Sequence, residues 1–288
     1  MKPVAIWLEA SRPKTLIASI SPAVLGTVLA WKSGSFSFLT LLLTLLTGVA
    51  IQIGTNFSND YFDFLKGADT SDRKGPRRVT QAGLVSLPVM KRAIFLTFTF
   101  AALFSIYLAF QGGPIISLLA VLYIALSLAY TAGPMPLAYF GLGDFFVLVF
   151  YGPIATLITY YLQTHQLPLH VALLGLSPGL ISTAILTANN LRDVNEDRRC
   201  NKKTLCVRFG ENFGRIEYTL CLIAAAAIPS FYGYYLPLLM LIPALIPIKA
   251  FWTVQDKKLL NVPFAQTGKL LLLFTVLMTC SIIWKHGL

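Results

Sequence analysis

The sequence predicts an all-α membrane protein with nine transmembrane helices. Of its 288 residues, 56% are hydrophobic and only 12% are charged, whereas soluble domains carry about 25% charged residues. Apolar runs of about 20 residues recur along the chain, and this is the length that a helix needs to cross a bilayer. The runs are continuous and do not alternate with polar residues, which excludes an outer-membrane β-barrel.

The nine predicted spans follow one another through connections that are short except after the second and the sixth. We place the spans at about 15–32, 37–58, 89–110, 114–131, 143–163, 169–190, 215–233, 235–252 and 267–285. No convincing cleavable signal precedes the first apolar run, so we expect it to be a retained span. The two long loops, about 59–88 and 191–214, are rich in Gly, Asp, Arg and Lys. Long loops in a helical bundle are commonly functional.

Lysine and arginine set the expected orientation of these spans. With the N-terminus inside, 21 of the 23 basic residues fall on the inner side, and Lys32 and Lys285 fall outside. The N-terminus and both long loops are therefore expected on the cytoplasmic side of the inner membrane. A formal charge of +11 is also typical of nucleic-acid-binding proteins. Basic residues between spans are better explained by topology and by anionic lipid or phosphate, so no nucleic-acid partner is expected.

Two short clusters, at the cytoplasmic ends of the second and sixth spans, contain seven of the twelve acidic residues. The first cluster contains Asn56, Asn59, Asp60 and Asp63, with Asp69 and Asp72 beyond it, and the second contains Asn189, Arg192, Asp193, Glu196 and Asp197. In each cluster an Asn precedes the first Asp by one helical turn. Steps of three or four residues place the polar members on one helix face. Carboxylates that share a face repel one another and oppose the helix dipole, so the clusters need a cation.

Magnesium is the cation that fits these clusters, since proteins hold it with a few carboxylates together with substrate phosphates. The predicted catalytic metal ligands are Asp60, Asp63, Asp193 and Asp197. The predicted amide contacts at the same polar site are Asn56, Asn59 and Asn189. Indirect ligation, loop orientation and simple solvation all stay open for Asp69, Asp72 and Glu196. The pattern predicts an enzyme that handles a diphosphate at a membrane surface.

A magnesium diphosphate also needs cationic side chains, because arginine binds phosphate through paired hydrogen bonds and lysine acts as a compact charge. The predicted substrate-binding cations are Lys14, Arg77, Arg78, Arg192, Lys202, Lys203 and Arg208. The alternative is that they enforce topology and touch lipid headgroups, or that Arg192 forms a structural salt bridge. Tyr130, at the end of the fourth span, is predicted as a substrate contact or an interface anchor. Asp144 begins the fifth span, where its charge favours the helix N-terminus.

The two clusters also suggest an internal repeat. They lie four spans apart in the same orientation, and each is followed by a basic loop. The chain is therefore expected to be a single domain, 1–288, in which spans 1–4 are repeated in spans 5–8 and a ninth span is added. The functional site would lie between the two halves. The four cysteines show neither metal-ligand spacing nor a paired framework.

The chain also contains a series of short motifs, which are RPKT (12–15), SPAVLGT (21–27), NDYFD (59–63), GADT (67–70), GPRRVTQAG (75–83), YTAGP (130–134), GLGD (141–144), NNLRD (189–193) and KKTL (202–205). With these motifs the sequence resembles the UbiA superfamily of intramembrane aromatic prenyltransferases over nearly the whole chain. The GPRR loop and the NNLRD stretch narrow the resemblance to the branch that prenylates 1,4-dihydroxy-2-naphthoate in menaquinone synthesis.

The resemblance implies nine helices around a central cavity, in which the four aspartates named above hold Mg²⁺ on a polyprenyl diphosphate. It also implies transfer of the prenyl group to the naphthoate with loss of carbon dioxide and diphosphate, which gives demethylmenaquinone. An apolar tunnel between helices would admit the prenyl tail from the lipid bilayer.

Three other interpretations fit part of the sequence. Another aromatic acceptor, such as 4-hydroxybenzoate or homogentisate, would keep the site and change the pathway. The CDP-alcohol phosphotransferases also place aspartates at a cytoplasmic helix end, but they gather them in one motif and not in two. A transporter of anionic solutes would use the repeat as its gate, although transporter sites usually lie at mid-membrane.

Overall fold

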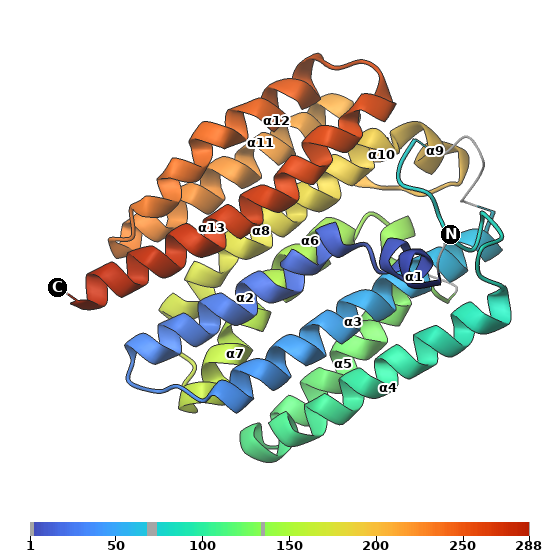
Figure 1. Cartoon of the computed structure of the whole chain (residues 1–288). Helices are drawn as coiled ribbons and strands as arrows, with labels where there is room; N and C mark the ends of the chain where they lie inside the picture. The colour runs from blue at the N-terminus through green and yellow to red at the C-terminus, as the bar shows by residue number, and fades with distance from the viewer. Residues whose placement is uncertain (1–2, 68–73, 134–135, 288) are drawn as a thin grey trace.

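The computed structural model describes residues 3–67, 74–133 and 136–287, and every regular element in that part of the chain is helical. Asp69 and Asp72 lie outside the described residues. The elements are α1 (Pro3–Ser11), α2 (Pro13–Lys32), α3 (Phe38–Leu65), α4 (Leu87–Gly112), α5 (Pro114–Ala129), η1 (Leu137–Tyr139), α6 (Gly143–Val149), η2 (Phe150–Ile154), α7 (Ala155–Thr164), α8 (Leu169–Arg192), α9 (Val194–Arg199), α10 (Leu205–Phe209), α11 (Glu211–Ala227), η3 (Ile228–Tyr232), η4 (Leu236–Met240), α12 (Leu241–Thr253), η5 (Lys257–Leu260) and α13 (Asn261–Gly287). Figure 1 shows the long helices packed as one bundle, with α1, α9 and α10 gathered at one end.

Seven helical segments in the described part of the chain are long and apolar enough to cross a membrane. They are Pro13–Lys32, Phe38–Leu65, Leu87–Gly112, Gly143–Thr164, Leu169–Arg192, Leu236–Thr253 and Lys257–Gly287. The apolar helix α5 is shorter, with 16 residues. The span expected at 215–233 falls on α11 and η3, which are not among the seven. The all-helical, many-span fold is thus confirmed, and the count of nine spans stays a prediction.

The outside and the inside of the bundle have the chemistry expected of a protein in lipid. Large apolar side chains face outward; Phe110, for example, is 86% exposed. Inside, buried side chains join helices that are distant in sequence. The hydroxyls of Ser21 and Thr275 lie 2.7 Å apart, as do those of Tyr218 and Thr267. Interhelical hydrogen bonds of this kind help to hold helices together where lipid replaces water.

The consecutive elements α6, η2 and α7 form one bent helix that packs against α8 through glycines. The bend lies at η2, where Gly152 has φ −122° and ψ −110° and Pro153 has no N–H to donate. A Cβ added at Gly152 would lie 2.8 Å from the carbonyl oxygen of Gly175. One added at Gly179 would collide with the carbonyl oxygen of Leu148. The two helices therefore touch backbone to backbone, an approach that only glycine permits.

The acidic clusters lie at helix ends as predicted, with one difference in the second cluster. Helix α3 extends through Asp60 and Asp63, but α8 ends just before Asp193 and α9 begins just after it, with φ −95° and ψ 11° at that residue. The second cluster therefore spans two helices and not one continuous helix. The N–H of Asp193 still donates to the carbonyl of Asn189, and that of Asp197 to the carbonyl of Asp193, each at 2.9 Å. These bonds keep the cluster together across the break.

Candidate active site

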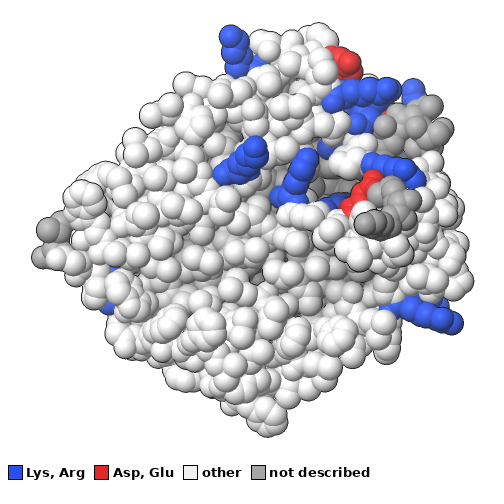
Figure 2. Space-filling model, viewed as in Figure 1, with Lys and Arg blue, Asp and Glu red and all other residues white. Residues whose placement is uncertain are grey.

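A cavity of about 220 Å³, here the main cavity, begins at the end of the bundle where the acidic clusters lie. Along α3 its lining runs from Gln52 through Asn59 to Asp63, and along α8 from Ser182 to Asn190, with Asp193 just beyond the end of that helix. Its charged lining residues near that end are Arg12, Asp63, Arg78, Asp193, Glu196, Asp197 and Lys202. Its aromatic and aliphatic lining includes Tyr123, Leu126, Phe146, Val147, Phe150, Tyr151, Ile185 and Leu186. Figure 2 shows basic side chains around a hollow toward this end, while most of the surface is uncharged.

Asp63 is the centre of the contacts in the first cluster. Its Oδ2 lies 3.4 Å from Nη2 of Arg78 and 3.3 Å from Nζ of Lys202. Its Oδ1 accepts a hydrogen bond from the hydroxyl of Tyr139 at 3.1 Å. The ring of Tyr139 lies 4.6 Å from Nζ of Lys66 and 5.0 Å from that of Lys202. Partial burial lowers the pKa of Lys66, although the charge of Asp63 acts in the opposite direction.

Asp60 and Asn56 hold neighbouring segments of the chain and are not among the described residues that line the main cavity. The two carboxylate oxygens of Asp60 accept hydrogen bonds from the backbone N–H groups of Val79 and Thr80, each at 3.1 Å. The side chain of Asn56 donates to the carbonyl of Ser11 at 2.9 Å. Both residues are buried. Asp60 thereby fixes the loop that carries Arg78, and its role as a metal ligand stays a prediction.

Arg192 is fully buried and organises the second cluster. Its Nε and Nη2 donate to the two carboxylate oxygens of Asp193 at 2.6 and 2.7 Å. Nη2 also donates to Oδ1 of Asn189 at 2.7 Å, and Nη1 donates to Oδ1 of Asn261 at 3.2 Å. Asn261 in turn donates to the carbonyl of Lys74 at 2.8 Å. This is the structural salt bridge that the sequence left open as an alternative for Arg192.

The other predicted cations divide into two groups. Arg78 and Lys202 line the main cavity, and Arg12, two residues before the predicted Lys14, lines it as well. The predicted residues that are exposed and do not line it are Lys14, Arg77, Lys203 and Arg208. The structure does not bring these four side chains into the site. Instead, Nη2 of Arg208 donates to the carbonyl of Phe140 at 2.8 Å.

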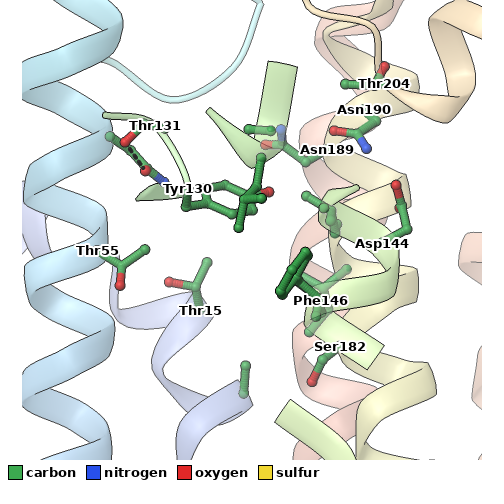
Figure 3. Close-up of a pocket in the computed structure, with 18 of the residues that line it drawn as sticks. Thr15, Thr55, Tyr130, Thr131, Asp144, Phe146, Ser182, Asn189, Asn190 and Thr204 are labelled. Atoms are coloured by element: carbon green, nitrogen blue, oxygen red, sulfur yellow. Dashed lines mark hydrogen bonds between the residues drawn. The ribbon is translucent and has the colours of Figure 1, made fainter. Parts of the chain in front are cut away.

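Tyr130 and Asn59 line the main cavity as predicted, and Figure 3 shows Tyr130 near its centre. The hydroxyl of Tyr130 reaches α6, because a Cβ added at Gly143 would lie 3.1 Å from it. Oδ1 of Asn59 accepts a hydrogen bond from Thr131 at 3.0 Å. Tyr139, which donates to Asp63, was not among the predicted site residues. The signal that could have found it is a tyrosine in the short connection between the fourth and fifth predicted spans, on the same side of the predicted topology as both basic loops.

The charged end of the main cavity fits a hard divalent cation bound together with a diphosphate. Carboxylates of Asp63, Asp193, Glu196 and Asp197 line it, and Oε2 of Glu196 is buried with no hydrogen-bond partner among the described residues. In the same part of the chain, no three acidic, histidine or cysteine side chains form a group that could hold a metal alone. Mg²⁺ is usually held by one or two carboxylates, with water and substrate phosphates completing its shell. These donors therefore suit magnesium in the presence of its substrate.

A second, apolar cavity of about 120 Å³ adjoins the main cavity. The two share Tyr123, Phe150 and Tyr151 as lining residues. The rest of its lining is small or aliphatic and comes from α2, α3, α4, α5 and α7. The bundle therefore has a charged compartment connected through aromatic side chains to a compartment that suits hydrocarbon.

Comparison with known proteins places the chain in a family. A model of the UbiA prenyltransferase family matches residues 19–263. A 1,4-dihydroxy-2-naphthoate octaprenyltransferase from Escherichia coli is 40% identical over 228 residues, which cover 77% of this chain and 74% of that protein. A protein of the same name from Mycobacterium tuberculosis is 35% identical over 232 residues, covering 80% and 78%.

Solved structures show that the fold is shared as well. A UbiA homologue from Aeropyrum pernix superimposes with a TM-score of 0.67 at 16% identity, covering 94% of this chain and 97% of that one. A homologue from Archaeoglobus fulgidus bound to DMAPP and Mg²⁺ gives 0.63 at 13% identity, covering 96% and 99%. The multi-span helices and the family match identify a multi-pass membrane enzyme of prenyl transfer, not a transporter or a CDP-alcohol phosphotransferase. The chain belongs to the UbiA prenyltransferase family.

Proposed function

We propose that this enzyme transfers a polyprenyl group from a polyprenyl diphosphate to 1,4-dihydroxy-2-naphthoate. Carbon dioxide and diphosphate would leave, and demethylmenaquinol, the reduced form of demethylmenaquinone, would form. The observation that carries the proposal is the joining of a charged compartment, lined by carboxylates and basic residues, to an apolar one through shared aromatic side chains. The choice of acceptor is supported by the names of relatives that are 35–40% identical over most of the chain.

The residues of the main cavity have complementary tasks in this reaction. Arg78 and Lys202, which converge on Asp63, bind the departing diphosphate and stabilise its negative charge. Mg²⁺, held by Asp60, Asp63, Asp193 and Asp197 together with the diphosphate, would supply further positive charge to the leaving group. The aromatic and aliphatic walls exclude water from the cation-like allylic carbon, so that the electron-rich ring attacks it first.

The same proposal covers the topology and the domain organisation. The basic loops at the charged end support a location of that end on the cytoplasmic side of the inner membrane, where the soluble substrate would enter. The prenyl tail lies in the second cavity and comes from the lipid side. The chain acts as a single domain, 1–288, in which spans 1–4 and 5–8 form a pseudo-repeat followed by the ninth span. Each half contributes one acidic cluster to the common cavity.

The decisive experiment is prenyl transfer by the purified protein in detergent. The assay supplies 1,4-dihydroxy-2-naphthoate and a long-chain isoprenyl diphosphate, with Mg²⁺ or with EDTA, and detects the product by mass. We expect demethylmenaquinol, or the demethylmenaquinone that oxidation by air gives from it, with Mg²⁺ and neither product with EDTA. Prenylated 4-hydroxybenzoate or homogentisate, in place of the naphthoate product, would keep the site and refute the acceptor.

A further inference from the structure

Asp144 is a buried carboxylate to which the proposed function gives no task. It lies in the first turn of α6, is 6% exposed and lines the main cavity. Its Oδ1 has no hydrogen-bond partner among the residues that the structure describes. Burying a polar atom without a partner is unfavourable, so a native protein that keeps one does so for a reason.

The neighbours of Asp144 do not satisfy that oxygen. The carboxylate interacts with its own backbone N–H and with the hydroxyl of Thr187. That hydroxyl also lies 3.0 Å from the carbonyl oxygen of Thr183 and 3.3 Å from Oε2 of Glu217. One hydroxyl hydrogen cannot serve three acceptors. The Thr187 hydroxyl therefore cannot supply Oδ1 of Asp144 as well, and a donor from a bound molecule would satisfy that oxygen.

The surroundings of Asp144 select the kind of donor. Phe146 and Leu186 also line the cavity, and Figure 3 shows Asp144 and Phe146 on the wall opposite Thr55. A metal ion is drawn instead to the charged end, where the other carboxylates gather. An aromatic ring that carries a hydroxyl fits this place, because the ring packs against apolar side chains while the hydroxyl donates to Oδ1.

We propose that Asp144 accepts a hydrogen bond from the acceptor hydroxyl next to the carboxyl-bearing ring carbon, and takes its proton as the prenyl group is attached. This assignment rests on the proposed function, because it takes 1,4-dihydroxy-2-naphthoate as the acceptor. Asp144 repels the acceptor's own carboxylate. That carboxylate therefore faces the cavity end lined by Arg12, Arg78 and Lys202, which orients the ring.

The electrons balance without a further reactant. As the hydroxyl proton moves to Asp144, the O–H pair forms a C=O bond, and the ring double bond forms the new C–C bond at the carboxyl-bearing carbon. The C–O pair of the prenyl diphosphate leaves with the diphosphate. The resulting β-keto carboxylate loses carbon dioxide, the bond pair returns through the ring to the oxygen, and Asp144 gives the proton back. General-base assistance of this kind is worth about 100- to 10,000-fold in rate.

The first test compares Asp144→Asn with a matched control, Glu217→Gln. Each variant removes one carboxylate charge beside the Thr187 hydroxyl, but Glu217 does not line the main cavity. With 1,4-dihydroxy-2-naphthoate, Asp144→Asn should lower kcat about 100-fold or more, while the KM for the prenyl diphosphate stays within about threefold of wild type. Glu217→Gln should stay within about threefold in both. Wild-type turnover in the same assay tests the proposed function separately.

The second test measures inhibition by 1-hydroxy-2-naphthoate and by 2-naphthoate, which differ in the hydroxyl alone. Asp144→Asn should weaken binding of the hydroxylated inhibitor about tenfold and leave 2-naphthoate unchanged, because a hydrogen bond to a charged group is lost. Equal losses for both inhibitors, equal losses in the two variants, or normal turnover by Asp144→Asn would each overturn the role of Asp144.

A second variant and a second acceptor are used if the first test gives no clear result. If Asp144→Asn does not fold, as judged by size-exclusion elution in detergent, Asp144→Ser is measured in the same way. If the wild type leaves the naphthoate unmodified but prenylates another hydroxylated acid, the proposed acceptor is wrong. The Asp144 variants are then assayed with that acid, and unchanged turnover would overturn the inference on its own.

Discussion

The first acidic cluster is held by side chains from elsewhere in the chain, whereas the second carries its own counter-ion. Asp63 meets Arg78 from the following loop and Lys202 from the other half of the protein. Asp193 pairs with Arg192, its neighbour in sequence. The two clusters have similar sequences, but their negative charge is neutralised by different means.

Each of the two loops that follow the clusters contacts the acidic cluster of the other half. Lys202, from the second loop, reaches Asp63 of the first cluster. In the reverse direction, Lys74 of the first loop accepts from Asn261, which also binds Arg192, and a Cβ added at Gly75 would lie 2.6 Å from Nη2 of that arginine. Neither cluster is complete without the other half, so the difference between them bears on the whole site.

We expect the largest effect from a substitution that breaks the ion pair between Arg192 and Asp193 in the second cluster. Asp193→Asn leaves Arg192 buried without its counter-charge, and removing one partner of a buried pair costs about 3–5 kcal/mol. We expect turnover to fall about 1,000-fold or more at saturating Mg²⁺, with a lower unfolding temperature. Glu211→Gln, which breaks ion pairs with Arg215 and Lys257 outside the cavity, should leave turnover within about threefold. Normal activity of Asp193→Asn would remove it as a metal ligand.

Asp60→Asn probes the first cluster at the residue that fixes its loop. Turnover should again be abolished, and in addition the amide cannot accept both N–H bonds from Val79 and Thr80. Limited trypsin digestion should therefore cut this loop, at Lys74 or Arg77, faster than in the wild type. Full activity would sink the role of Asp60 at the metal, and an unchanged cleavage rate would argue against its hold on the loop.

A smaller effect separates two adjacent arginines of the first loop. Arg78 is 6% exposed and contacts Asp63, whereas Arg77 is exposed. We expect Arg78→Ala to lower kcat/KM for the prenyl diphosphate about 100-fold, since a charge-assisted hydrogen bond is worth about 1.5–3 kcal/mol and more when its partner is left buried. Arg77→Ala should change it less than about threefold. Equal effects would show that the loop moves when substrate binds.

We expect the smallest effect from a substitution that tests whether the prenyl tail lies in the second cavity, within the first half of the chain. The second cavity is lined mainly by the first four spans, and Ala120 on α5 is one of its walls. Ala120→Phe should fill part of this space and favour shorter prenyl diphosphates by about tenfold in kcat/KM, as judged from product masses with mixed substrates. Ala125→Phe, at an exposed position of the same helix, is the control. An unchanged chain-length preference would place the tail elsewhere.

Hydropathy predicted where the helices lie, because the need to satisfy backbone groups in lipid leaves few other solutions. It did not predict the bend at Gly152 or the break at Asp193, since both depend on what packs against the helix. Nor does the sequence distinguish Arg77 from Arg78. Which of the two turns inward is decided by the hydrogen bonds that Asp60 accepts from the residues just after them.

At the glycine contact, α8 and the bent helix meet through backbone atoms. Sliding of packed helices usually needs side chains that can change rotamer, and this contact has none, so the two helices are held in one relative position. Asp144 and Asp193 therefore belong to one rigid body. The spacing between the ring of the acceptor and the allylic carbon of the donor is largely set before either molecule arrives, which favours reaction once both are bound. We therefore expect the motion that admits them to occur in the opposite wall of the cavity, formed by α2, α3 and α5.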